Sequence, residues 1–123
     1  MSIASARDRA LEFAGLLRLM GPIEVSRFFG GAGLVKDGVQ FAFVMKGTLY
    51  LRVDDDSRPI FEALGAAPFT YAGQSQAVRV ASYYEVPDSV TEGADEFLRW
   101  ATRACLAAVK AKLEPRRRPR LRA

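Results

Sequence analysis

The chain has 123 residues, half of them apolar and about a quarter charged, so we expect one soluble globular domain with its own hydrophobic core. It contains no histidine and a single cysteine, Cys105. These counts exclude an intrachain disulfide, Ser-His-Asp or Cys-His catalysis within one chain, and a histidine-ligated metal.

The net charge of +4 is concentrated at the C-terminal end. Without the five arginines of residues 116–123, the chain has 13 basic and 14 acidic residues, a net charge of −1. We therefore predict a near-neutral domain over residues 1–114 and a basic, disordered tail over residues 115–123. The tail either contacts DNA phosphates or only keeps the chain soluble. Its candidate nucleic-acid contacts are Arg116, Arg117, Arg118, Arg120 and Arg122.

The N-terminal residues do not form a signal peptide, because charged residues such as Arg7, Asp8 and Glu12 interrupt every apolar run. No run approaches the roughly 20 apolar residues that a membrane-spanning helix needs. We expect a cytoplasmic protein.

Two long helices are predicted, one near each end of the domain. Ser5 to Met20 has apolar residues at spacings of three and four, and Gly21-Pro22 ends it. Its expected core residues include Leu16, Leu17 and Met20. Gly93 to Leu113 is the second helix, and its alanines leave it thin enough for close packing, either on the sheet or against a partner. Cys105 falls within its apolar face, with no base to activate the thiol.

Strands fill the segment between Ile23 and Val53. Asp37-Gly38 and Lys46-Gly47 separate β-rich runs and predict hairpin turns. In the last run Leu49, Leu51 and Val53 share one face, whereas the run before it is expected to point Phe41, Phe43 and Met45 one way and Ala42 and Val44 the other.

Glycines at positions 30, 31 and 33 raise the possibility of a phosphate cradle. Phosphate binding of that kind needs backbone N–H groups converging at a helix N-terminus. Here the glycines lead into Leu34-Val35 and then a turn, so a bent or bulged strand is favoured.

Three adjacent carboxylates, Asp54 to Asp56, raise the possibility of a cation site. A calcium loop needs ligands spaced over about a dozen residues with a central glycine, which is missing here. The favoured interpretation is that an Asp or Ser57 caps a short helix with Pro59 in its first turn, an apolar face of Ile60, Phe61 and Leu64, and Gly65 at its end.

Two more extended segments precede the last helix. Pro68 to Tyr71 is followed by a polar turn, and Ala77 to Val86 is a strand. Its period of two is expected to place Val78, Val80, Ser82 and Tyr84 on one face.

Several blocks, read in order, match one family. They are F-F-G-G-A-G-L-V-K-D-G (28–38), G-T-L-Y-L-R-V-D (47–54), R-P-I-F-E-A-L-G (58–65), P-F-T-Y (68–71), Y-Y-E-V-P-D (83–88) and L-R-W-A-T-R-A-C-L-A-A (98–108). Over roughly residues 11–112 the chain resembles the TfoX N-terminal domain, from the TfoX/Sxy group of bacterial competence regulators. It departs from the family pattern at Ala32 and Val35, where aromatic residues are usual.

The resemblance implies a two-layer α+β fold: an antiparallel sheet with an N-terminal helix, a short middle helix and a long C-terminal helix packed on it, similar to secretion-chaperone-like domains. The family's full-length regulators promote transcription of DNA-uptake genes with the cyclic-AMP receptor protein and carry a second, C-terminal domain. Because a basic tail takes the place of that domain here, we expect a stand-alone N-terminal domain. The family has no catalytic residues that we can transfer.

We predict a non-enzymatic interaction module linked to transcription and competence, acting by protein contacts, with non-specific DNA contact through the tail. No catalytic, cofactor or metal site is expected. The alternative is a dimeric, chaperone-like partner-binding protein without a nucleic-acid role. An enzyme would have to draw on the scattered polar residues Tyr50, Tyr71, Tyr83, Tyr84, Arg27, Arg79 and Glu85.

Overall fold

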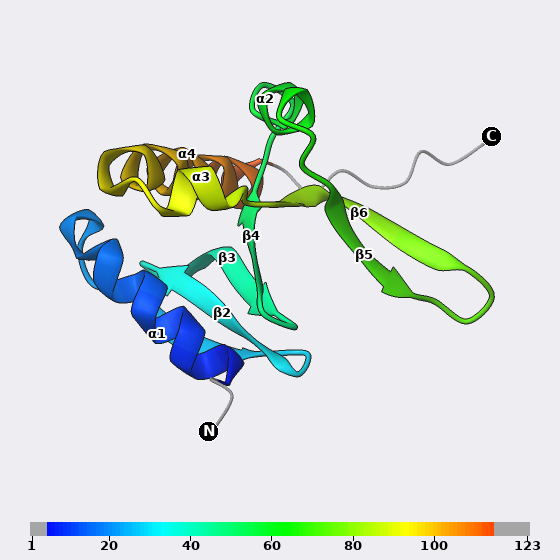
Figure 1. The fold of residues 1–123 in the computed structure, drawn as a ribbon, viewed down its shortest axis with the longest axis horizontal. Helices are drawn as coiled ribbons and strands as arrows, with labels where there is room; N and C mark the ends of the chain where they lie inside the picture. The colour runs from blue at the N-terminus through cyan, green and yellow to red at the C-terminus, as the bar shows by residue number, and fades with distance from the viewer. Residues whose placement is uncertain (1–4, 115–123) are drawn as a thin grey trace.

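The computed structural model describes residues 5–114 and contains an α+β fold (Figure 1). The helices are α1 (Ala6–Leu16), the 3₁₀ helix η1 (Arg18–Met20), α2 (Arg58–Ala63), α3 (Asp88–Thr91) and α4 (Ala94–Leu113). The strands are β1 (Glu24–Phe28), β2 (Gly31–Lys36), β3 (Val39–Met45), β4 (Thr48–Arg52), β5 (Pro68–Ala72) and β6 (Ala77–Glu85). The predicted fold class is confirmed; the short helix α3 was not predicted.

All six strands form one antiparallel sheet in the order β1-β2-β3-β4-β6-β5. Helix α1 packs on β1, β2 and β3, and α4 packs on β3 and β4, so one face of the sheet is covered by helices. The β5–β6 hairpin extends away from both helices (Figure 1). We call the covered side of the sheet the helix face and the opposite side the outer face.

Each of the first three hairpins turns through two residues that both have positive φ, the pattern of a type I′ turn. Asp37-Gly38 and Lys46-Gly47 were predicted, and the structure confirms them. The remaining turn, Phe29-Gly30, joins β1 to β2, and Phe29 has a φ of 46°. It was not predicted, because a bulky aromatic residue is disfavoured at positive φ.

The core under the helix face is built from small residues of α4 and large residues of the sheet. Ala101, Ala104 and Ala108 are buried against this chain's own core, which includes Leu34 and Leu51. The alanines therefore bring α4 close to the sheet, and the alanine-rich face is already covered within the molecule.

The N-terminal helix begins as predicted but ends earlier. Ser5 caps it, accepting the N–H of Asp8 at 3.0 Å in a reciprocal capping box. The α-helix ends at Leu16, and the chain tightens into η1. Leu17 is buried, whereas Leu16, still within α1, is 56% exposed, so the prediction that Leu16 belongs to the core is wrong.

A bulge in β3 changes which side chains share a face. Leu34 pairs with Ala42 and Val35 with Gln40, which leaves Phe41 without a partner in the ladder. Phe41 and Ala42 consequently both pack in the helix-face core. The expected grouping of Phe41 with Phe43 is therefore wrong, since Phe43 packs among the aromatic rings of the outer face.

Strand β6 is irregular in the same way. Pro68 pairs with Tyr84, but the next residue of β5, Phe69, pairs with Val80. The residues between Val80 and Tyr84 break the period of two, so Tyr84 belongs to the helix-face core while Val80 faces the outer side. The expectation that these two residues share a face is wrong.

The glycine segment opens a strand. Gly31 and Gly33 are paired residues of β2, and the next element after β2 is β3 rather than a helix. A Cβ at Gly31 would collide with the carbonyl oxygen of Val44, and one at Gly33 with the side chain of Gln40. Gly31 is therefore needed for the close approach of the strand backbones, whereas the obstacle at Gly33 is the end of a flexible side chain. The irregularity in strand pairing lies just beyond these glycines, between Leu34 and Val35.

Across residues 5–114, the helices are too short or too polar for any of them to cross a membrane.

Candidate interaction surfaces

The outer face carries an apolar cavity of about 410 Å³, which we call the aromatic groove. Only strands and the β1–β2 turn contribute to it, and its volume is within the roughly 300–1,000 Å³ typical of ligand sites. The groove is lined by Phe28, Phe29, Phe43, Met45, Phe69, Tyr71, Val80, Ser82 and Tyr83.

Phe43 forms the floor of the aromatic groove. Its ring centroid lies 4.6 Å from Phe28, 4.8 Å from Tyr83 and 5.0 Å from both Tyr50 and Phe69. Phe28 comes from one edge strand and Phe69 from the other, so the curled sheet brings its two edges together over Phe43. As a result Phe43 is only 1% exposed, although no helix contributes to the groove.

The rim of the aromatic groove presents two aromatic side chains to solvent. Phe29 is 87% exposed and Tyr71 is 49% exposed. Phe29 also keeps the positive φ of the turn, a strained backbone conformation for a bulky residue. An exposed aromatic residue held in such a conformation is more typical of a contact surface than of a folding requirement.

The groove is almost free of polar groups. The hydroxyl of Tyr83 donates to the carbonyl of Gln40 at 3.3 Å, and Tyr71 and Ser82 contribute two further hydroxyls. Tyr50 sits beneath the groove, where burial and then the charge of Glu85 raise its pKa, so the phenol stays neutral. With no charged residue in its lining, the groove suits apolar groups.

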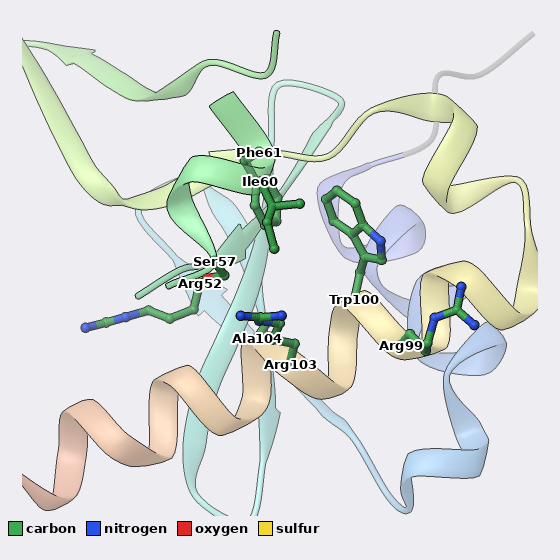
Figure 2. A pocket seen from close by; sticks show the side chains of 8 residues that line it. All are labelled: Arg52, Ser57, Ile60, Phe61, Arg99, Trp100, Arg103 and Ala104. Atoms are coloured by element: carbon green, nitrogen blue, oxygen red, sulfur yellow. The ribbon is translucent and has the colours of Figure 1, made fainter. Parts of the chain in front are cut away.

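A second cavity, of about 230 Å³, lies between α2 and α4 (Figure 2). Trp100 packs edge-on against Phe61 at 4.6 Å between ring centroids, and its Nε1–H donates to Glu96 at 2.8 Å. Glu96 also pairs with Arg99. We call this cavity the arginine pocket; its lining residues are Arg52, Ser57, Ile60, Phe61, Arg99, Trp100, Arg103 and Ala104.

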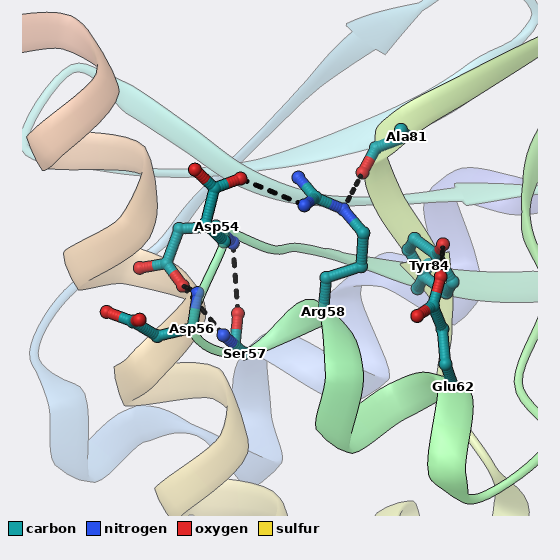
Figure 3. Close-up of polar contacts among 8 residues, drawn as sticks. Asp54, Asp56, Ser57, Arg58, Glu62, Ala81 and Tyr84 are labelled. Atoms are coloured by element: carbon teal, nitrogen blue, oxygen red, sulfur yellow. Dashed lines mark hydrogen bonds and ion pairs between the residues drawn. The ribbon is translucent and has the colours of Figure 1, made fainter.

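The three adjacent aspartates are used within the loop before α2 (Figure 3). Asp54 accepts the N–H groups of Asp56 at 3.0 Å and Ser57 at 2.8 Å, while the Ser57 hydroxyl accepts the Asp54 N–H at 2.9 Å. Asp55 pairs with Arg58 at 2.9 Å. Ser57 stands at the N-cap of α2, one of the predicted positions, but no side chain caps the helix. The Asp54 carboxylate instead orders the turn that precedes it. Residues 5–114 contain no acidic, histidine or cysteine cluster able to hold a metal.

Asp54→Ala is expected to lower the free energy of unfolding by about 1–2 kcal/mol at pH 7, because two backbone N–H groups lose their acceptor. Burial opposes ionisation of Asp54, but hydrogen bonds from Ser57 and Asp56 and the charge of Lys110 hold its pKa below the ordinary value. The carboxylate therefore stabilises the fold above the unfolded pKa of about 3.9, and this contribution is lost as pH falls through the lower folded value.

Urea unfolding at pH 7 and at pH 2 checks this expectation. The difference between wild type and Asp54→Ala should shrink at the lower pH, while the control Asp56→Ala should stay within about 0.5 kcal/mol of wild type at pH 7. An undiminished difference at pH 2 would contradict the assigned role of the ionised carboxylate.

Cys105 is half-buried on α4, and burial raises the pKa of its thiol despite the opposing charge of Lys36. The thiol is consequently protonated near neutral pH, which does not favour nucleophilic chemistry.

The structure brings together only part of the polar set named from the sequence. Tyr71 and Tyr83 line the aromatic groove and Tyr50 lies beneath it, but Tyr84 faces the helix core, where it donates to Glu62 at 2.6 Å (Figure 3). The five tail arginines lie outside the described residues. The groove itself was not predicted. The sequence feature that could have indicated it is the presence of aromatic residues close to two turns, at positions 28 and 29 and at positions 69 and 71.

A family model described as the TfoX N-terminal domain matches residues 15–108, which is most of the chain. No curated protein matches the sequence.

Proposed function

Because the chain belongs to the TfoX N-terminal domain family, we propose that it is a non-enzymatic interaction module that acts by protein contacts through the aromatic groove. The observation that supports this proposal is the groove itself: an open cavity of about 410 Å³ with aromatic walls and no charged lining residue. Apolar, aromatic-rich concave surfaces of this kind are characteristic of binding sites on soluble domains. A partner from the transcription machinery is the expectation that goes with the family resemblance.

The partner that suits the groove is an extended protein segment with apolar side chains at alternate positions. Strand β5 is at the edge of the sheet and pairs only with β6, so the backbone groups on its other side have no strand partner in residues 5–114. Phe69 and Tyr71 of β5 line the groove. A segment added beside β5 gains main-chain hydrogen bonds and sends every second side chain toward these rings.

A peptide selected from a random library on the intact protein tests this proposal. The selected sequences should share apolar residues at alternate positions, and Tyr71→Ser should weaken their binding by about tenfold or more, because exposed aromatic anchors carry most of the affinity of such contacts. Leu64→Ser is the matched control, since Leu64 is 55% exposed but does not line the groove.

Selected peptides without that alternation, or with equal affinity for Tyr71→Ser and Leu64→Ser, would contradict the proposal. Light scattering on the same samples gives the molecular mass and so tests the alternative in which the partner is a second copy of the chain.

The second part of the proposal is non-specific DNA contact through the arginines of residues 116–123. The five arginines in that segment, against a net charge of −1 for the rest of the chain, support it. Five phosphate contacts correspond to a slope of about −4 to −5 for log affinity against log salt concentration. A chain that ends at Pro115 should lose this binding and keep its unfolding transition. Unchanged DNA binding by the shortened chain would refute tail-mediated contact.

A further inference from the structure

The arginine pocket has an apolar interior and a cationic rim. Ser57, Phe61 and Ala104 are buried in its walls, and Trp100 is half-buried beside them. Ile60 is partly exposed at the mouth. The pocket shares no lining residue with the aromatic groove, so a ligand here would be a separate one.

Its charges are of one sign, since three arginines and no carboxylate line it. Glu96 already pairs with Arg99, whereas Arg103 makes no ion pair or side-chain hydrogen bond within residues 5–114. Figure 2 shows the Arg103 side chain over Ala104 beneath Ile60, while Arg52 and Arg99 extend outward on opposite sides. Arg52 likewise makes no ion pair or hydrogen bond within these residues, and its buried Nε has no partner, but its guanidinium lies over the Tyr83 ring. Arg103 is therefore the unpaired guanidinium at the centre of the pocket.

We propose that the arginine pocket binds a carboxylate carried on an apolar body, with Arg103 pairing the carboxylate and Trp100 and Phe61 packing against the body. A planar guanidinium matches the two oxygens of a carboxylate. A monoanion suits the single central cation better than a phosphate dianion, whose charge is costly to remove from water into an apolar-walled space. The cavity of about 230 Å³ accepts one ring-sized group and is smaller than typical drug-sized sites.

Such a carboxylate has two sources with the same chemistry: a free small organic acid, or the C-terminal residue of a partner peptide. The pocket opens between two helices on the surface, and both sources present an apolar group next to a carboxylate.

Trp100 is the only tryptophan of the chain, so its fluorescence reports on this pocket alone. Phenylacetate is the probe, with phenylacetamide as a neutral probe of the same shape and inorganic phosphate as the competing anion. Phenylacetate should change the fluorescence saturably, with a dissociation constant at least about tenfold lower than that of phenylacetamide, because a charge-assisted hydrogen bond is lost with the amide. Equal affinity for the two probes, or tighter binding of phosphate, would overturn the proposal.

Arg103→Gln should weaken phenylacetate binding by about tenfold or more and leave phenylacetamide binding unchanged. Arg103 is exposed, so the variant is expected to fold, and far-UV circular dichroism verifies this. Arg79→Gln, on the distant β5–β6 hairpin, is the matched control and should bind like wild type. Full phenylacetate affinity in Arg103→Gln would also overturn the proposal.

Pentaglycyl-phenylalanine, with a free C-terminal carboxylate, separates the two sources. Tighter binding of the peptide than of phenylacetate assigns the pocket to a partner's C-terminus, and weaker binding assigns it to a free acid. The same peptide with an amidated C-terminus lacks the carboxylate. If it binds as tightly as the peptide with the free carboxylate, both sources are contradicted.

Discussion

Phe43→Ala is expected to lower the free energy of unfolding by about 3–5 kcal/mol, although the side chain belongs to the sheet face that the helices do not cover. Four aromatic rings surround Phe43 with centroids within 5.0 Å, and the residue is 1% exposed. Truncation removes all four contacts and leaves a cavity that the β-sheet backbone cannot close. Guanidinium chloride unfolding, followed by circular dichroism, measures the change.

Phe29→Ala is the matched control, because it removes the same side chain from a position that is 87% exposed. Its free energy of unfolding should stay within about 0.5 kcal/mol of wild type. If Phe43→Ala lowers the free energy of unfolding by less than about 1 kcal/mol, the aromatic rings packed around Phe43 on the outer face do not form a stabilising core.

Gly31→Ala is expected to destabilise the fold by about 2–4 kcal/mol, a large effect for one methyl group. The added Cβ would collide with the carbonyl oxygen of Val44 and lie 3.3 Å from that of Phe28. Both obstacles are backbone atoms fixed by the strand ladder, so neither moves aside without loss of pairing between β2 and its neighbours.

The same substitution at Gly15 should stabilise the fold instead of destabilising it. Gly15 lies within α1, and nothing is within 4 Å of the position that its Cβ would occupy. Gly15→Ala should therefore raise the free energy of unfolding by about 0.5–1 kcal/mol. Equal unfolding midpoints for Gly31→Ala and Gly15→Ala in urea would contradict the close approach of β2 and β3.

The elements were predictable wherever the chain follows a regular period. The alternation of Leu49, Leu51 and Val53 identified the helix face, and the alanines of residues 93–113 indicated a helix that packs closely, as α4 does on the sheet. The Asp-Gly and Lys-Gly turns were predictable because glycine accepts positive φ.

The errors within the strands arise where residues without a partner in the neighbouring strand interrupt that period. One interruption is the bulge at Phe41, and the other is the stretch of β6 between Val80 and Tyr84 that is irregularly paired with β5. Beyond each of them, the side chains point to the opposite face of the sheet from the one that the period of two predicts. Such positions depend on the partner strand, which local sequence does not reveal.

The aromatic groove could not be predicted for the same reason. It brings together Phe28, Phe43, Phe69 and Val80 from four strands, and Val80 reaches the outer face because of the irregular pairing of β5 with β6. The arginine pocket likewise needs α2 against α4, although Trp100 with Arg99 and Arg103 was visible as a cluster on one helix.

The central claim is that the aromatic groove and the edge of β5 receive a partner segment. The most direct test is nuclear magnetic resonance of the isotopically labelled protein with a library-selected peptide. The account predicts contacts between the peptide and the rings of Phe69 and Tyr71, with new protection of β5 amide protons from exchange. Contacts confined to α1 or α4, with unchanged exchange in β5, would contradict it.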